Sequence, residues 1–176
     1  IKAVANGNYV KADFDDANNN GQLKAVSTTV SGWEAFTFTA VSLNVTTVNC
    51  PGTFSVADYS FKSDGITINE NGGNTYAGNL TANTYLEYTV DVATAGNYNF
   101  NLGLATTGTD RTLFITVDGV STGTFTPAAG SDWFTFSNYS IVINFAAGVH
   151  TLRITPSAGI NITNPSFTVY EEGQGG

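Results

Sequence analysis

The sequence predicts an all-β protein, built as a sandwich or a barrel, and three observations support this. Short runs alternate apolar and polar residues, and they are rich in Val, Ile, Thr, Phe and Tyr, as half-buried strands are. Asn and Gly separate these runs, and helical periodicity is hard to find anywhere in the chain. The predicted strands are residues 9–12, 23–26, 36–41, 85–92, 98–104, 112–117, 139–145, 150–154 and 166–170.

The segments between the predicted strands have the composition of turns. Asp118-Gly119 directly follows one strand and indicates a two-residue hairpin, because both central positions of such a turn need a positive φ. Asn71-Gly72-Gly73-Asn74 is a second turn signal, since Asn and Gly tolerate left-handed backbone. The regular occurrence of turns between short strands is what predicts a sandwich or barrel.

A domain boundary is predicted at Pro51, in the sequence Asn49-Cys50-Pro51-Gly52, because Pro cannot donate to a strand ladder and Gly allows a turn. Residues 1–50 would form a small lobe with its connector, too short to bury a core of its own. Residues 51–171 are enough for an independent sandwich. Residues 172–176 are Gly-rich and are predicted to be a flexible tail.

The composition excludes several classes of partner. Charged residues are only 11% of the chain, and the net charge is -8, from 14 acidic against 6 basic residues. Nucleic acid and anionic membranes need clustered Lys and Arg, so neither is expected as a partner. Low charge with much Asn, Thr and Gly suits a secreted, extracellular protein. The chain starts without Met, and we expect it to be a processed piece of a longer protein.

The sequence offers little of what an enzyme needs. His150 is the only histidine and Cys50 the only cysteine, so neither a zinc site nor a Ser-His-Asp triad has its partners. Glycoside cleavage needs two carboxylates that face one another, and the acids are scattered without a recurring pair. We therefore predict no catalytic residues. An aromatic in a polar loop, as in Gly130-Ser131-Asp132-Trp133, suits the binding of a neutral polymer.

Residues 51–170 resemble the family 6 carbohydrate-binding modules, which are β-jelly-roll sandwiches attached to polysaccharide-degrading enzymes. The resemblance rests on stretches that occur in the family's order. They are PGTFSVADY at 51–59, GGNTYAGNLTANTYLEYTVDVATAGNYNFNLGLAT at 72–106, LFITVDG at 113–119, SDWFTF at 131–136, AAGVHTLRI at 146–154 and GINITNPSF at 159–167. The resemblance implies a non-catalytic module with a jelly-roll fold.

The resemblance also implies a sugar site among the loops at one end of the sandwich. The family's stacking Trp falls on Trp133, and its hydrogen-bonding Asn falls on Asn161. A second family aromatic falls on Asn79, which cannot stack a sugar, and Tyr76 is the candidate to replace it. From the residues alone, Trp133 could instead pack on its own loop, and Asn161 could cap a turn.

No cofactor is predicted to be required. Family members often carry two carboxylates in the opening strand, which line the cleft or hold a structural calcium. Ser55 and Ala57 occupy those places here, and Ser166 replaces a third acid. The sequence therefore argues against a calcium site of the family's usual type.

Residues 1–41 resemble one lobe of a fascin-like β-trefoil, through IKAVANGNYVKAD at 1–13, LKAV at 23–26 and SGWEAFTF at 31–38. Such lobes accompany sugar-binding modules in secreted glycoside hydrolases, so the resemblance implies a covalently linked catalytic domain. It also places a laminarin-type β-1,3-glucan first among the ligands, before agarose and xylan. The alternative hypothesis is a structural or protein-docking module whose sugar cleft has decayed, as Asn79 would suggest.

Overall fold

The computed structural model describes residues 9–13, 22–27 and 46–171. The chain divides into two compact units, Ile1–Leu43 and Asn44–Gly176. In the first unit, β1 (Tyr9–Asp13) pairs antiparallel with β2 (Gln22–Ser27). The remaining residues of the predicted trefoil lobe lie outside the described residues, as does the predicted tail at 172–176.

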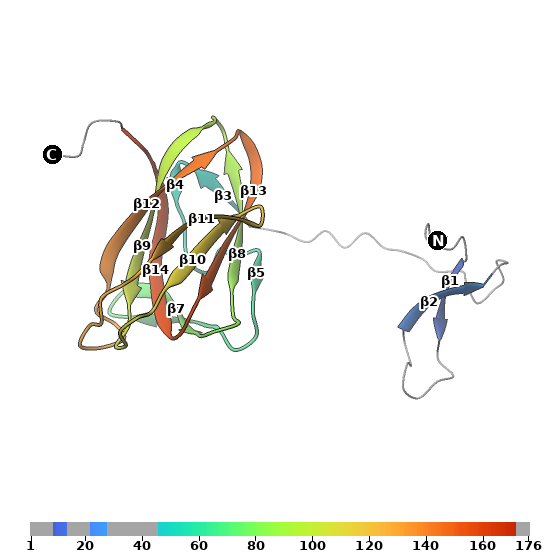
Figure 1. Ribbon diagram of the computed structural model, residues 1–176, viewed down its shortest axis with the longest axis horizontal. Helices are drawn as coiled ribbons and strands as arrows, with labels where there is room; N and C mark the ends of the chain where they lie inside the picture. The colour runs from blue at the N-terminus through green and yellow to red at the C-terminus, as the bar shows by residue number, and fades with distance from the viewer. Residues whose placement is uncertain (1–8, 14–21, 28–45, 172–176) are drawn as a thin grey trace. The chain divides into compact units, whose positions relative to one another are not determined.

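The second unit is a sandwich of two sheets, and no helix occurs within residues 46–171 (Figure 1). The β8 sheet has the order β11-β10-β13-β8-β3, with β5 also paired to β8. Its strands are β3 (Thr47–Cys50), β5 (Phe61–Lys62), β8 (Leu86–Val92), β10 (Leu113–Val117), β11 (Val120–Phe125) and β13 (Gly148–Pro156).

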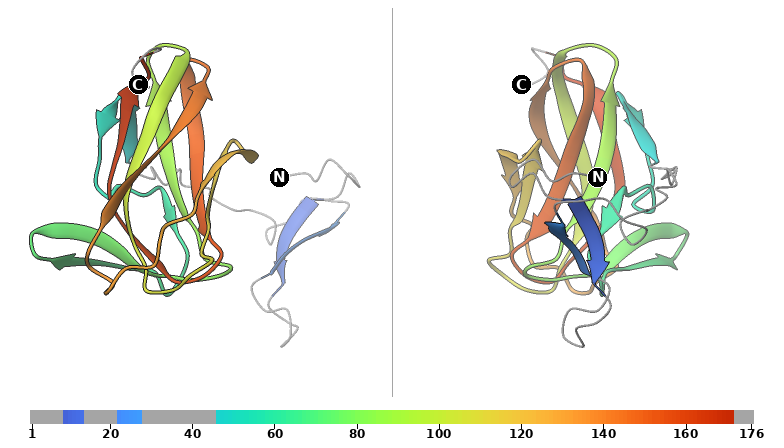
Figure 2. Two further views of the ribbon diagram at one scale, coloured as in Figure 1. Left: turned by 60° about the vertical axis from the view of Figure 1, so that its left-hand side comes forward. Right: turned by 90° about the vertical axis from the view of Figure 1, so that its right-hand side faces the viewer.

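The β14 sheet has the order β12-β9-β14-β7-β6, with β4 also paired to β14. Its strands are β4 (Gly52–Thr53), β6 (Thr67–Asn71), β7 (Asn74–Leu80), β9 (Gly96–Ala105), β12 (Ser137–Phe145) and β14 (Ile160–Val169). The β6–β7 hairpin projects from the side of the sandwich (Figure 2). The predicted all-β sandwich is therefore confirmed.

The core lies between the two sheets, because alternate side chains of each strand point inward. In β8 every second residue is buried, from Leu86 to Val92. Rings from both sheets meet in the middle: Phe100 of β9 packs on Phe125 of β11 at 6.2 Å between ring centroids. Burying each such large side chain contributes roughly 1.5–3 kcal/mol. This core holds both sheets as one rigid support for the loops at their ends.

The predicted hairpin turn and the predicted boundary can both be compared with the structure. Asp118 and Gly119 connect β10 to β11 with φ of 51° and 79°, as the two-residue turn requires. Strand β3 precedes Pro51, yet it pairs in parallel with β8 and buries Val48 and Cys50 in the core. The sandwich therefore begins before the boundary predicted at residue 51.

Two predicted elements differ from the structure for identifiable reasons. Tyr76 lies in none of the predicted strands but belongs to β7; the turn predicted at residues 71–74 is present and connects β6 to β7, whereas the two strands themselves were not predicted. The last strand was expected at 166–170 but starts at Ile160. Residues 160–163 are all buried, and shifts of register interrupt the pairing of β14. The regular alternation that marks a strand is therefore missing from its first half.

Candidate functional site

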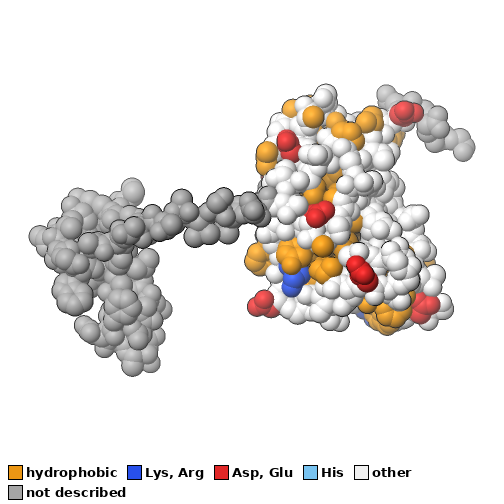
Figure 3. Space-filling view, turned by 180° about the vertical axis from the view of Figure 1, so that it is seen from behind, with side chains coloured by type: hydrophobic (Ala, Val, Ile, Leu, Met, Phe, Trp, Pro, Cys, Tyr) orange, Lys and Arg blue, Asp and Glu red, His pale blue; other side chains and the backbone are white. Residues whose placement is uncertain are grey.

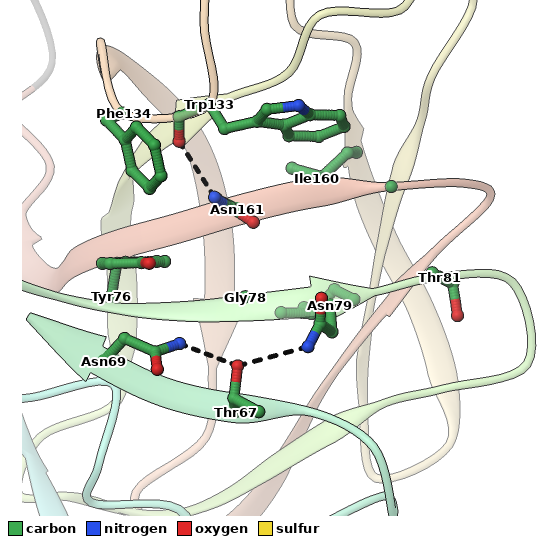
Figure 4. Close-up of a pocket in the computed structure, with 12 residues that line it drawn as sticks. Thr67, Asn69, Tyr76, Gly78, Asn79, Thr81, Trp133, Phe134, Ile160 and Asn161 are labelled. Carbon is green, nitrogen blue, oxygen red and sulfur yellow. Dashed lines mark hydrogen bonds between the residues drawn. The ribbon is translucent and has the colours of Figure 1, made fainter.

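A pocket of about 530 Å³ opens where the β11–β12 loop meets strands β6, β7 and β14 (Figure 4). Its size suits a small ligand or a short stretch of polymer. None of the described residues that line it is charged. They are Thr67, Asn69, Tyr76, Gly78, Asn79, Leu80, Thr81, Trp133, Phe134, Gly159, Ile160 and Asn161.

The loop that carries Trp133 and Phe134 is held by Asp132. Its carboxylate Oδ1 accepts hydrogen bonds from the backbone N–H groups of Phe134 and Thr135, each at 2.7 Å, and its Oδ2 accepts one from Thr135 Oγ1 at 3.0 Å. These donors hold the pKa of Asp132 below its usual value, the Phe134 N–H most of all. The carboxylate thus stays ionised at neutral pH and fixes a tight turn that presents two aromatic rings.

The indole of Trp133 is packed against two partners. The guanidinium of Arg111 lies 5.7 Å from the ring centroid, and Arg111 Nη1 donates a hydrogen bond to the carbonyl of Gly159 at 3.0 Å. The backbone of Gly159 lies so close to the ring that a Cβ there would stand 3.2 Å from the indole Cη2. Arg111 and Gly159 therefore fix the orientation of the half-buried indole that lines the pocket.

Asn161 joins this loop to β14. Its side chain is only 7% exposed, and its Nδ2 donates a hydrogen bond to the backbone carbonyl of Trp133 at 2.9 Å. Because the amide nitrogen faces that carbonyl, the amide oxygen faces the pocket (Figure 4). Asn161 can thus accept a hydrogen bond from a ligand hydroxyl while it positions the loop.

Tyr76 extends the aromatic side of the pocket. It lies on β7 and meets Phe134 in an edge-to-face contact with 5.6 Å between ring centroids. Phe136 packs against Tyr76 as well, at 6.1 Å. Phe134 itself is 48% exposed, so its ring faces solvent as well as the pocket. Together, Trp133, Phe134 and Tyr76 form what we call the aromatic wall.

Asn79 lies across the pocket from Trp133 (Figure 4), at a φ of 58° that Asn tolerates better than most residues. Its Nδ2 donates to Thr67 Oγ1 at 3.4 Å, and Asn69 Nδ2 donates to the same hydroxyl at 2.7 Å. We call Thr67, Asn69 and Asn79 the polar wall. Trp133 therefore lies across the pocket from Asn79, and the aromatic wall meets the polar wall where Tyr76 lies opposite Asn69 in the β6–β7 hairpin.

The structure brings all four sequence-predicted site residues, Trp133, Asn161, Tyr76 and Asn79, to this one pocket. Sequence reasoning missed others. Phe134 follows Trp133 directly, and that adjacency was an available signal. Arg111 contacts the indole from another loop, and nothing in the sequence pairs residues so far apart.

Ser55 and Ala57, at positions where the family often has acidic residues, form part of a turn here. Ser55 N donates to Asp58 Oδ2 at 2.8 Å, and Ala57 N donates to Ser55 Oγ at 3.1 Å. Within the described residues no group of three or more His, Cys, Asp or Glu is placed to hold a metal ion. The described part of the chain also has no helix long and apolar enough to span a membrane.

A rigid sandwich that holds aromatic rings beside an uncharged pocket suits an uncharged ligand with both apolar and hydrogen-bonding groups. The model of the family "Carbohydrate binding module (family 6)" matches residues 57–169, which is more than half of the chain. The chain therefore belongs to family 6 of the carbohydrate-binding modules. These are non-catalytic domains, so the prediction that the module is not an enzyme is confirmed.

Solved structures with the same fold include several sugar-binding modules. A module from lichenase 5A of Cellvibrio mixtus, solved with cellotriose, is 22% identical, with a TM-score of 0.61 over 69% of this chain and 98% of the other. A family 6 module from Clostridium cellulolyticum, solved with xylose, is 21% identical, with a TM-score of 0.60 over 68% and 98%. A module from the laminarinase LamC of Zobellia galactanivorans is 16% identical, with a TM-score of 0.61 over 66% and 97%. Comparison with curated proteins finds no match.

Proposed function

We propose that the module binds a neutral polysaccharide in the pocket between the aromatic wall and the polar wall. The observation that carries the proposal is the indole of Trp133, fixed by Arg111 and Gly159 over a pocket whose described lining carries no charge. A sugar ring has faces of C–H groups that stack on an aromatic ring. Its hydroxyls need partners of the kind that amides provide.

Binding would combine one stacked ring with a few hydrogen bonds. Removing a sugar face and the indole face from water contributes about 1–3 kcal/mol. The Asn161 oxygen and the polar wall add hydrogen bonds, each worth roughly 0.5–1.5 kcal/mol net. Such a site should reach a Kd of about 10 µM to 1 mM.

A surface poor in charge is consistent with a neutral ligand. Figure 3 shows one face of the sandwich, on which acidic and basic side chains are few among uncharged ones. With 14 acidic against 6 basic residues overall, an anionic polymer would be repelled at long range. Laminarin-type β-1,3-glucan, agarose and xylan are all neutral and are the candidate ligands.

We extend the proposal to the biological setting. The module would be the binding part of a secreted glycoside hydrolase, which it holds on its polymer. Two of the solved relatives support this, since their names place them in a lichenase and a laminarinase. On this view no cofactor is needed, because stacking and hydrogen bonding suffice.

Affinity electrophoresis in gels that contain laminarin, agarose or xylan tests the proposal. Wild-type protein should be retarded by at least one polymer, and Trp133→Ala should migrate as it does without polymer. Phe114→Ala is the matched control, because Phe114 is another exposed aromatic, 44% exposed, on the β8 sheet away from the pocket. Equal retardation of wild type and Trp133→Ala on every polymer would contradict the proposal and favour a docking role.

A further inference from the structure

The two walls of the pocket offer a bound sugar ring different chemistry on its two faces. Trp133 presents an aromatic ring from above, and Asn79 and Thr67 lie across the pocket from it (Figure 4). Between them, Ile160, Asn161 and Gly78 form the floor. A ring that enters with one face on the indole therefore turns its other face toward amides and a hydroxyl.

The polar wall has hydrogen-bonding groups left for a ligand. Thr67 Oγ1 accepts hydrogen bonds from the amides of Asn69 and Asn79, so its own proton is free to be donated elsewhere. The amide oxygens of Asn69 and Asn79 accept no hydrogen bond from the described residues. The wall thus presents a hydroxyl donor and, beside it, the amide oxygen of Asn79, which points toward the side of the pocket on which Trp133 lies (Figure 4).

An all-equatorial pyranose such as glucose does not match this arrangement. Its hydroxyls project from the edge of the ring, and both of its faces consist of C–H groups. A C–H face pressed on the polar wall would take the hydroxyl and the amides out of water without giving them partners, which is unfavourable. An axial hydroxyl, in contrast, points along the face normal, directly toward that wall.

We propose that the pocket selects a hexopyranose with one axial ring hydroxyl, stacked on Trp133 by its apolar face and bonded through that hydroxyl to Thr67 and Asn79. This rests on the proposed function and specifies its ligand. Galactose is such a sugar, because its 4-hydroxyl is axial where that of glucose is equatorial. The structure thus ranks a β-1,3-linked galactan above the laminarin-type glucan that the sequence placed first.

Isothermal titration with laminaritetraose and β-1,3-galactotetraose tests this, because the two differ only in the configuration at C4. The galactan fragment should bind at least about fivefold more tightly to the wild type. Thr67→Val keeps the shape of an exposed side chain but removes the hydroxyl, and it should reduce that preference to less than twofold. Asn79→Ala should act in the same direction.

Asn83→Ala is the control for Asn79→Ala, because Asn83 also has a positive φ and does not line the pocket. It should keep the full preference. Equal or tighter binding of laminaritetraose by the wild type would overturn the inference, as would a galactan preference that survives both Thr67→Val and Asn79→Ala. If neither tetrasaccharide binds, and no neutral polymer retards the protein, the proposed function fails as well.

Discussion

Two regions of the sandwich expose aromatic rings, and they differ in what already occupies those rings. In the pocket of the β14 sheet, Trp133 has a cation at 5.7 Å and turns toward an uncharged cavity. On the β8 sheet, the ring of Tyr85 stacks on Phe61 with 5.0 Å between centroids, and the guanidinium of Arg153 lies only 4.2 Å from it.

The charges around Tyr85 hold that arrangement together. Arg153 Nη2 lies 2.6 Å from Glu87 Oε1, and Arg153 Nε donates to the same oxygen at 2.8 Å. This pair fixes the guanidinium on the tyrosine ring. Phe61 remains 44% exposed, yet a sugar on this patch would have to displace charged partners. Under the proposed function, exposure alone does not make a binding platform, and the uncharged cavity beside Trp133 is what distinguishes the pocket from this patch.

The largest expected effect comes from removing the pocket ring itself. Trp133→Ala should weaken binding of a soluble oligosaccharide by about 30-fold, which corresponds to about 2 kcal/mol of lost stacking. The thermal unfolding midpoint should change little, because the indole is only half-buried. Isothermal titration measures the first quantity and circular dichroism the second. A loss of affinity of less than twofold would contradict the proposal that the pocket and the Tyr85 patch differ in sugar binding.

A smaller effect is expected from Asn161→Asp. A carboxylate cannot donate to the carbonyl of Trp133, and two acceptor oxygens would then face each other at a buried position. We expect affinity to fall about tenfold and the free energy of unfolding to fall by about 1–3 kcal/mol. Isothermal titration measures the affinity and urea unfolding measures the free energy of unfolding, both on the same preparation. Unchanged stability would show that Asn161 does not hold the loop.

Arg111→Ala should have a moderate effect, because it removes a contact of the indole rather than the indole itself. We expect affinity to fall about threefold, since cation–π contacts at exposed sites contribute about 0.5–1 kcal/mol. Acrylamide quenching of Trp133 should rise, measured in a Trp33→Phe background that leaves one tryptophan. Arg153→Ala is the matched control and should change neither quantity. Identical quenching in wild type and Arg111→Ala would contradict the positioning role.

The smallest expected effect on binding comes from pH, which should act on the β8 sheet and not on the pocket. Both ring nitrogens of His150 face acceptors, Asp118 Oδ2 at 2.7 Å and the carbonyl of Ala146 at 3.0 Å. The hydrogen bond to Asp118 is the main cause that raises the pKa of His150 above its ordinary value of 6.5. The pKa of Asp118 is lowered mainly by the hydrogen bond from the backbone N–H of Thr151, and to a smaller extent by the hydrogen bond with His150.

Protonated His150 therefore adds stability that is fully present below pH 6.5 and is lost as the pH rises through its raised pKa. Ionised Asp118 adds stability that is present above its ordinary pKa of 3.8 and is lost as the pH falls through its lowered one. The melting temperature should fall modestly between pH 6 and pH 8, and His150→Gln should flatten that slope. Oligosaccharide affinity should stay constant over the same range. A parallel change in affinity would link the two regions.

Much of the fold could be predicted because its signals are local. The strands around Tyr88 and Phe100 alternate buried and exposed residues, and Asp118-Gly119 encodes its turn directly. Strand β6 could not be predicted in this way, because its hairpin projects from the sandwich and none of its residues is fully buried. Ile68 is the one residue of β6 that packs against the core, so the strand offers a single apolar position and no alternation to detect.

The site was predictable in its members but not in their arrangement. Trp133 and Asn161 followed from the resemblance, and both line the pocket. Tyr76 was expected to replace the aromatic missing at Asn79, yet it packs on Phe134 and extends the wall on which Trp133 already lies. The polar wall arises only when the β6–β7 hairpin brings Thr67 beside Asn79; the sequence predicted the turn of this hairpin but not the strands on either side of it.

The most direct test of a sugar-stacking indole is a fluorescence titration of the Trp33→Phe protein, in which Trp133 is the sole tryptophan. With a soluble oligosaccharide that binds by calorimetry, stacking on the indole should give a saturable change in Trp133 emission with the same Kd. Calorimetric binding that leaves the emission of Trp133 unchanged would contradict it, and would place the sugar on another surface.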